Sequence, residues 1–149
     1  MSENVVLTYK KGKFQHEAQA GNHIWIVDEP QSMGGDDEGP SPYDMILAAL
    51  GACTSMTIMM YARQKGWPLE DLSVELSHDR IYAKDCQDCE TNEGQVDEIH
   101  RKITLMGPLS DEQIERLTKV GERCPVHRAL VGEIKVRDEV VHTEAKLKR

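Results

Sequence analysis

The sequence predicts an α+β fold in which antiparallel sheets pack around one long, buried central helix. The segment Met45–Ala62 contains no charged side chain and is long enough for several helical turns. Segments before and after it alternate polar and apolar residues, as half-buried strands do. The expected order is three strands, a helix, two strands, a helix and a strand, which indicates mainly antiparallel pairing. The 149 residues are expected to form one domain, 1–149.

The N-terminal strands are expected within residues 4–28. Three short β-type runs follow one another here, at Val5–Tyr9, Lys13–Ala20 and 23–29. Gly21 and Asn22 mark the turn before the third run, so the three runs predict a meander. The next segment, 30–42, is rich in Gly, Asp, Ser and Pro and predicts a loop.

The central helix is expected over residues 42–65. Ser41 is a good N-cap, and Pro42 suits the first helical position. Gly66, with Pro68 beyond it, ends the helix. Because the helix is apolar on nearly all faces, it must be covered by protein, and one sheet covers only one side. We therefore expect a homodimer with this helix near the interface.

The second half of the chain repeats the pattern of strands followed by a helix. A strand pair is expected within residues 72–106, followed by a helix that Ser110 caps. Pro125 interrupts that helix just after Cys124. The expected elements are strands at Leu72–Tyr82 and Glu98–Met106, a second helix at 111–124, a short helical turn at Val126–Val131 and a C-terminal strand at 132–142.

Composition excludes several classes of protein. Twenty-six acidic residues against 18 Lys and Arg give a net charge of −8, which argues against nucleic-acid binding. The hydroxyl side chains within Met45–Ala62 favour a core helix over a membrane span. The first twenty residues carry no apolar signal segment, so we expect a cytoplasmic protein whose four cysteines are used for chemistry or metal binding.

Two of the cysteines are candidates for thiol chemistry. Cys53 lies in the middle of the apolar helix, and Cys124 lies at a break between a helix and Pro125. A plain packing role stays open for both, since burial in apolar surroundings makes a thiol inert. A reactive Cys53 needs a cation or a hydrogen-bond donor beside the sulfur. The sequence offers Arg63, Arg80, Arg123, His127 and Arg128.

The other two cysteines, Cys86 and Cys89, form a C-x-x-C pair in a polar segment. This spacing suits zinc, yet four ligands are needed and no second such pair exists in the sequence. Plain loop cysteines, a disulfide and a redox relay to Cys53 and Cys124 stay open as alternatives. No cofactor is expected elsewhere in the chain, and zinc is the one candidate at this pair. Further ligands could come from His78, His100, Asp85 and Glu90.

A resemblance to a known family rests on two motifs. The segment SPYDMILAALGACTSMTIMMYARQKGW and the downstream CPVHRAL resemble the OsmC/Ohr family of osmotically induced and organic-hydroperoxide-resistance proteins, most closely its YhfA-like branch. The resemblance covers about residues 30–142 and implies an intertwined homodimer. It also implies a thiol-dependent peroxidase that reduces organic hydroperoxides and is reset by an external dithiol. Cys53 would attack the peroxide, and Cys124 would resolve the sulfenic acid as a disulfide.

The sequence departs from the peroxidases of that family at one important point. Those proteins carry a Glu directly after the Pro that opens the helix, and this Glu orients an activating Arg from the N-terminal strands. Tyr43 occupies the Glu position here, and no Arg precedes Arg63. Two alternatives therefore stay open: a dimeric small-molecule binding or sensing protein without peroxidase activity, and a metal-binding module at Cys86 and Cys89.

Overall fold

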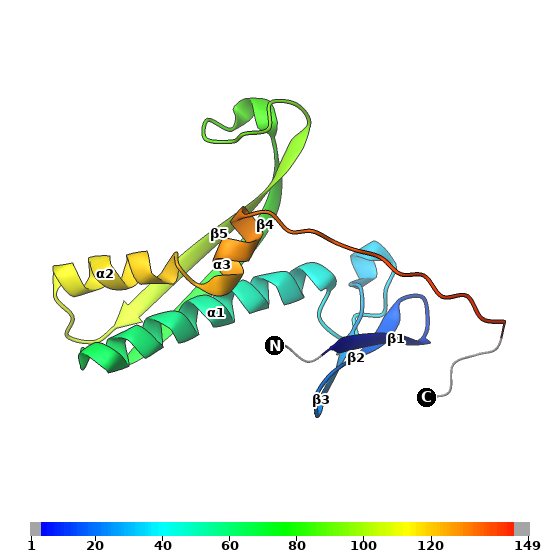
Figure 1. The fold of residues 1–149 in the computed structure, drawn as a ribbon, viewed down its shortest axis with the longest axis horizontal. Coiled ribbons are helices and arrows are strands. Elements are labelled where there is room, and N and C mark those ends of the chain that lie inside the picture. Colours follow the sequence, from blue (N-terminus) through cyan, green and yellow to red (C-terminus); the bar gives the residue numbers. More distant parts are fainter. Residues whose placement is uncertain (1–3, 145–149) are drawn as a thin grey trace.

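Residues 4–144 are described by the computed structural model, and they form two antiparallel sheets and three α-helices (Figure 1). The α+β class and the antiparallel pairing are confirmed. The elements are β1 (Val5–Lys11), β2 (Gln15–Ala20), β3 (His23–Val27), α1 (Pro42–Lys65), β4 (Asp71–Tyr82), β5 (Gln95–Met106), α2 (Asp111–Gly121) and α3 (Pro125–Val131), with short 3-10 turns at Gln31–Met33 and Ala83–Asp85.

The N-terminal sheet is the predicted meander, with strand order β1-β2-β3. Gly12 and Gly21 adopt the positive φ angles of 67° and 58° that the two tight turns require. Ala18 and Val27 are the buried apolar side chains of this sheet. The sheet lies beyond the N-terminal end of α1, away from the other helices (Figure 1).

The predicted bounds of the central helix are confirmed at both ends. Ser41 Oγ accepts from Asp44 N at 3.2 Å, and Asp44 Oδ2 accepts from Ser41 N at 3.0 Å. This reciprocal pair is a capping box, so Asp44 completes the helix cap. Gly66 ends the helix in the left-handed region, with φ 66°.

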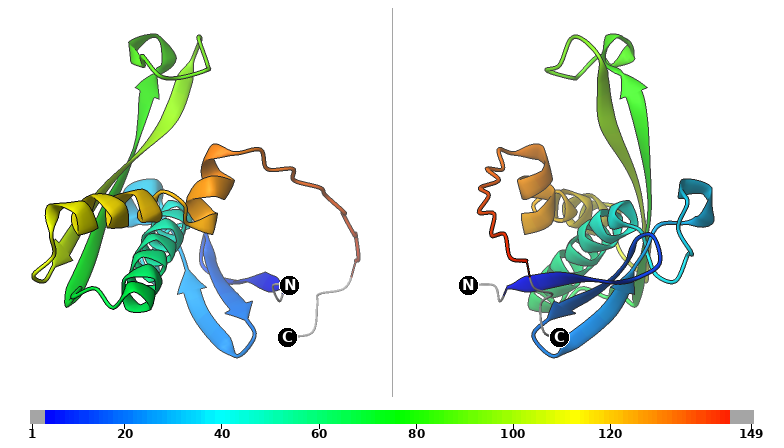
Figure 2. Two further views of the ribbon diagram at one scale, coloured as in Figure 1. Left: turned by 60° about the vertical axis from the view of Figure 1, so that its left-hand side comes forward. Right: turned by 90° about the vertical axis from the view of Figure 1, so that its right-hand side faces the viewer.

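The strands β4 and β5 form a long hairpin that pairs from Asp71↔Met106 to Tyr82↔Gln95. Its base packs against α1, whereas its tip projects away from the helices (Figure 2). The core between hairpin and helices is centred on Ile58, Ala62 and Leu117.

The second helix ends earlier than the predicted 111–124. Its last residue is Gly121, and a turn leads to Cys124, which adopts an extended conformation with ψ 143°. A residue before proline is disfavoured in the helical region, which explains why Cys124 lies outside both helices. The predicted helical turn after Pro125 is present as α3.

One face of α1 is open in the single chain. Ile58 is fully buried, whereas Met56 and Met60 are 64% and 62% exposed. The helix is therefore central, as predicted, but only partly buried by its own chain. By length and composition alone α1 could cross a bilayer, and the core helices of many soluble proteins could do so too.

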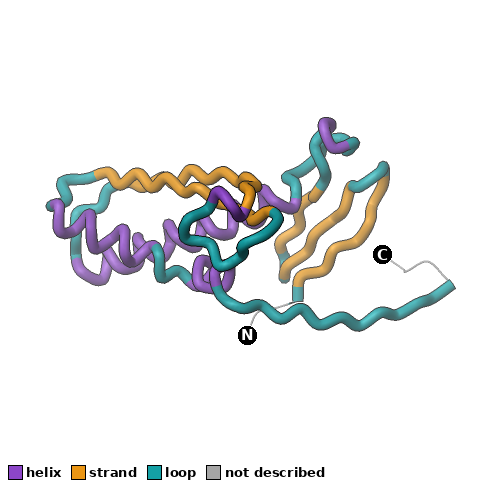
Figure 3. Tube along the Cα trace, turned by 90° about the horizontal axis from the view of Figure 1, so that it is seen from above, coloured by secondary structure: helices purple, strands orange, loops and turns teal. Residues whose placement is uncertain are grey.

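The C-terminal strand predicted at 132–142 is not formed in the single chain. The segment is extended without strand pairing, and it leads from α3 away from α2 (Figure 3). Val136 and Val140 are 78% and 90% exposed. A strand needs a neighbouring edge to satisfy its backbone groups, and within residues 4–144 this segment pairs with none.

Candidate functional site

Cys124 is the more deeply buried of the two candidate thiols. Its side chain has no exposed surface, and its Sγ accepts a hydrogen bond from His127 N at 3.2 Å. On its other side, Sγ lies 3.7 Å from Oγ1 of Thr54, which is also fully buried. The structure encloses this thiol between α1 and α3.

Thr54 connects Cys124 to a guanidinium group. Its hydroxyl donates to the carbonyl oxygen of Leu50 at 2.7 Å, and Oγ1 accepts from Arg101 Nη1 at 2.9 Å. Since the hydroxyl proton is already used, the Cys124 S–H is the donor in the contact with Thr54. Arg101, Thr54 and Cys124 therefore form a continuous polar chain through the packed region between β5, α1 and α3.

Cys53 is adjacent to Thr54 in sequence but lies about 100° around the helix from it. It is partly buried and carries a free thiol, as does Cys124. Within residues 4–144 the side chain of Cys53 makes no hydrogen bond or ion pair. The structure thus joins Cys124 to Thr54, and it shows no direct contact between the two predicted thiols.

The cations that the sequence offered are engaged elsewhere or exposed. Arg80 Nε pairs with Asp97 Oδ1 at 3.3 Å, and Arg63 is exposed at the end of α1. His127 reaches Cys124 through its backbone N–H alone. Arg101 was missed by the sequence analysis. Arg101 lies on β5 two residues from both Ile99 and Ile103, and therefore on the same face of the strand. A charged residue at a position where the pattern predicts an apolar one was the available signal.

A cavity of about 660 Å³ opens beside this polar chain. This volume is typical of small-molecule sites. Leu50 and Arg101 lie at one end of it, with His127 of α3. The other lining residues are Tyr43, Ile46 and Leu47 of α1, His78 of β4, Asp97 and Ile99 of β5, and Leu130 and Val131 of α3.

The apolar stretch of the cavity separates two polar ends. On α1 the lining residues follow helical spacing from Tyr43 to Leu50, a rise of about 10 Å. On β5 they alternate from Asp97 to Arg101, about 13 Å along the strand. One end therefore carries Arg101, next to Thr54. The opposite end carries Tyr43, His78 and Asp97.

Tyr43 belongs to a cluster of side chains from α1, β4 and β5. Its ring stacks on His78 with centroids 4.4 Å apart. His78 Nε2 lies 2.8 Å from Asp97 Oδ1. Hydrogen bonds with Tyr43 and Asp97 raise the pKa of Arg80. Hydrogen bonds from His78 and then from Arg80 lower the pKa of Asp97.

Cys86 and Cys89 lie far from this site, at the tip of the β4–β5 hairpin, and are joined as a disulfide. Of the supplementary metal ligands that the sequence offered, His78 is bound to Asp97 and His100 to Glu98. The acidic residue that lies with the two sulfurs is Asp88.

Comparison with known proteins reveals the family of this chain. An OsmC-like protein from Mycoplasma pneumoniae is 20% identical, with a TM-score of 0.69 over 89% of each chain. The organic hydroperoxide resistance protein OsmC of Legionella pneumophila is 21% identical, with a TM-score of 0.61 over 87% of this chain and 90% of the other. No curated protein matches the sequence. The family model for OsmC-like protein matches residues 35–138, and the chain belongs to this family.

Proposed function

We propose that the protein is a thiol-dependent peroxidase that reduces organic hydroperoxides through Cys53 and Cys124. Family membership supports this activity, since several structural relatives are organic hydroperoxide resistance proteins. The observation that carries the proposal is the chain of contacts from Arg101 through Thr54 to Cys124. These contacts bring a guanidinium to Thr54, the residue next to Cys53 in the sequence. The N-terminal strands, where family peroxidases carry their activating Arg, contain no Arg in this protein.

The chemistry needs two thiols and one hydroperoxide. The Cys53 thiolate attacks the distal oxygen of ROOH, the O–O bond breaks, and the alkoxide leaves as ROH after taking a proton. Cys53 is then a sulfenic acid. The Cys124 thiol attacks that sulfur, forms the Cys53–Cys124 disulfide and releases water. An external dithiol returns two electrons and two protons to the pair by thiol–disulfide exchange.

Arg101 has two tasks in this scheme. A nearby cation favours a thiolate over a thiol, which is the general requirement for a reactive cysteine. Its fixed donors also stabilise the negative charge that develops on the leaving oxygen. Thr54 Oγ1 accepts a hydrogen bond from Arg101 Nη1 at 2.9 Å and so holds the guanidinium beside the turn of α1 that bears Cys53. Thr54 is fully buried, which leaves its hydroxyl little freedom to move.

The cavity supports an organic rather than an inorganic substrate. Six of its lining side chains are aliphatic, so an alkyl or aryl group loses its contact with water on entering, whereas hydrogen peroxide gains nothing from them. The lining aliphatic residues are Ile46, Leu47, Leu50, Ile99, Leu130 and Val131.

Two features of the single chain support a homodimer as the working unit. Met56 and Met60 form an exposed apolar strip on α1, and the segment 132–142 is extended and unpaired. A second copy would bury the strip and offer an edge to the extended segment. A reducing compartment such as the cytoplasm would supply the dithiol that the cycle consumes.

Single-cysteine variants test the assignment. In Cys53→Ser the reaction with cumene hydroperoxide should stop. In Cys124→Ser one equivalent should react, and Cys53 should then oxidise further to sulfinic acid because no resolving thiol remains. Cys86→Ser serves as a matched control and should retain turnover. Equal amounts of cumene hydroperoxide consumed by Cys53→Ser and Cys124→Ser would overturn the assignment.

A second candidate function is binding or sensing of a small molecule without peroxide chemistry. The specific observation in its favour is that neither Cys53 nor Cys124 lines the cavity. In that case an apolar ligand would bind Cys53→Ser and the native protein equally well, and neither would consume hydroperoxide.

A further inference from the structure

The tip of the β4–β5 hairpin is a separate, solvent-exposed unit. It starts where Tyr82 pairs with Gln95, and Ala83 N donates to Gly94 O at 2.9 Å, which closes the loop. Ala83 alone is buried in the loop, and the cysteines are partly exposed. The loop therefore contributes little to the core, and its chemistry has to be explained separately from packing.

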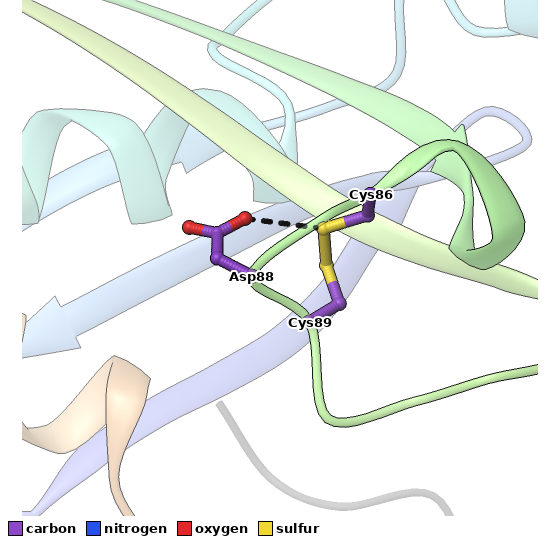
Figure 4. The surroundings of a disulfide bond; sticks show 3 residues. All are labelled: Cys86, Asp88 and Cys89. Atoms are coloured by element: carbon purple, nitrogen blue, oxygen red, sulfur yellow. Dashed lines mark hydrogen bonds between the residues drawn. A yellow bond between two sulfur atoms is a disulfide. The ribbon is translucent and has the colours of Figure 1, made fainter.

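Three metal-binding atoms gather on four consecutive residues of this loop. The Sγ atoms of Cys86 and Cys89 and a carboxylate oxygen of Asp88 all lie within 4.8 Å of one another. Figure 4 shows the Asp88 carboxylate directed toward the Cys86 sulfur, at 3.4 Å. Sulfur and carboxylate oxygen together are a donor set that suits zinc. The two Cα atoms are 5.6 Å apart, so side-chain rotation can change the spacing of the sulfurs.

The charge around the pair favours a bound cation over a free thiolate. Asp85, Asp88 and Glu90 lie within one residue of a cysteine, and Glu93 follows in the same loop. Neighbouring carboxylates disfavour an unpartnered thiolate, which speaks against a nucleophilic role. A bound divalent cation reverses the effect of these carboxylates on the site. They then attract the positive charge of the metal ion, which in turn stabilises the two thiolates.

We propose that the reduced Cys86–Cys89 pair is a binding site for a thiophilic divalent cation of the zinc class. Cys86 and Cys89 supply thiolates, Asp88 supplies a carboxylate oxygen, and water occupies the fourth position. Binding releases the two thiol protons. The disulfide and the metal site are alternative states of one loop, so a dithiol must first reduce the disulfide, itself becoming oxidised, before the cation can bind.

Cobalt(II) is a direct probe of this site, because thiolate-to-cobalt charge transfer absorbs in the near ultraviolet. Full-length protein is reduced, freed of reductant under nitrogen and titrated with Co²⁺, and Zn²⁺ is then added. We expect one Co²⁺ per chain with the thiolate band, and its loss when Zn²⁺ displaces it. Protein kept oxidised is the internal control and should show no band.

Variants assign the signal to the loop. The double variant Cys86→Ser/Cys89→Ser should lose the band, and Asp88→Asn should weaken Co²⁺ binding by about tenfold or more. Cys53→Ser/Cys124→Ser should keep it in full. Since the loop lies outside the core, far-ultraviolet circular dichroism should be unchanged in Cys86→Ser/Cys89→Ser and in Asp88→Asn. A reduced native protein without the band, or a band that survives in Cys86→Ser/Cys89→Ser, would overturn the proposal.

Discussion

Arg101 of β5 donates a hydrogen bond from Nη1 to Oγ1 of Thr54 on α1, at 2.9 Å. The contact joins a cation to the helix turn that bears Cys53 and, through Thr54, to Cys124. In the proposed mechanism Arg101 takes the place of an Arg from the N-terminal strands, since the sequence contains no Arg before Arg63. The catalytic arrangement proposed above depends on this contact more than on any other.

Removing the guanidinium should therefore slow peroxide reduction. We expect Arg101→Gln to lower the second-order rate constant with cumene hydroperoxide by about tenfold or more, because a neutral side chain favours neither the thiolate nor the leaving alkoxide. Arg101→Lys should restore only part of the rate, since Lys lacks the fixed fork of donors. Stopped-flow kinetics measures both constants. A rate for Arg101→Gln equal to the native one would remove Arg101 from the mechanism.

Filling the cavity should discriminate against large substrates. Leu47→Trp places a larger side chain on the cavity wall, so we expect KM for cumene hydroperoxide to rise by about tenfold and that for hydrogen peroxide to change little. Leu47→Met, which nearly conserves the volume, is the matched control. A uniform effect of Leu47→Trp on both peroxides would mean that the cavity is not the substrate site.

The exposed strip on α1 should mediate dimerisation. A charge at Met56 would have to be buried without a partner, so we expect Met56→Asp to weaken the dimer by about a hundredfold or more. Met56→Leu keeps the apolar surface and should sediment as the native protein does. Sedimentation velocity across a concentration series distinguishes the two. If native and Met56→Asp proteins are both monomers, the homodimer itself is refuted.

Acid should weaken the Tyr43 end of the cavity through Asp97. Hydrogen bonds from His78 and Arg80 lower the pKa of Asp97 in the folded protein. A depressed pKa contributes stability that is fully present above the unfolded value, near pH 4, and is lost as pH falls through the folded value. The difference in urea midpoint between native protein and Asp97→Asn should therefore shrink below about pH 4. A difference that stays constant down to pH values well below that range would contradict this assignment.

Local signals made the central part of the fold predictable. The bounds of α1 follow from Ser41, Pro42 and Gly66, whose effects depend only on their immediate neighbours. The alternation of polar and apolar residues, together with the glycine at the turn before β3, likewise predicted the strands of both sheets. The resemblance to the OsmC/Ohr family could be recognised from two short motifs, and the family match over residues 35–138 confirms it.

Long-range relationships could not be read from the sequence. The contact of Arg101 with Thr54 depends on how β5 lies against α1, which no local pattern specifies. The C-terminal strand predicted at 132–142 needs a sheet edge, and alternation alone cannot show whether one is within reach. Spacing left the state of Cys86 and Cys89 open for a similar reason, since a C-x-x-C pair suits both a disulfide and a metal.

The most direct test of the central claim is the reaction of the reduced native protein with cumene hydroperoxide and, separately, with hydrogen peroxide. Peroxide loss is followed in time, and disulfides are mapped by mass spectrometry. We predict faster loss of the organic peroxide, together with a disulfide between Cys53 and Cys124. A Cys53 that stays reduced while either peroxide persists would contradict the peroxidase assignment.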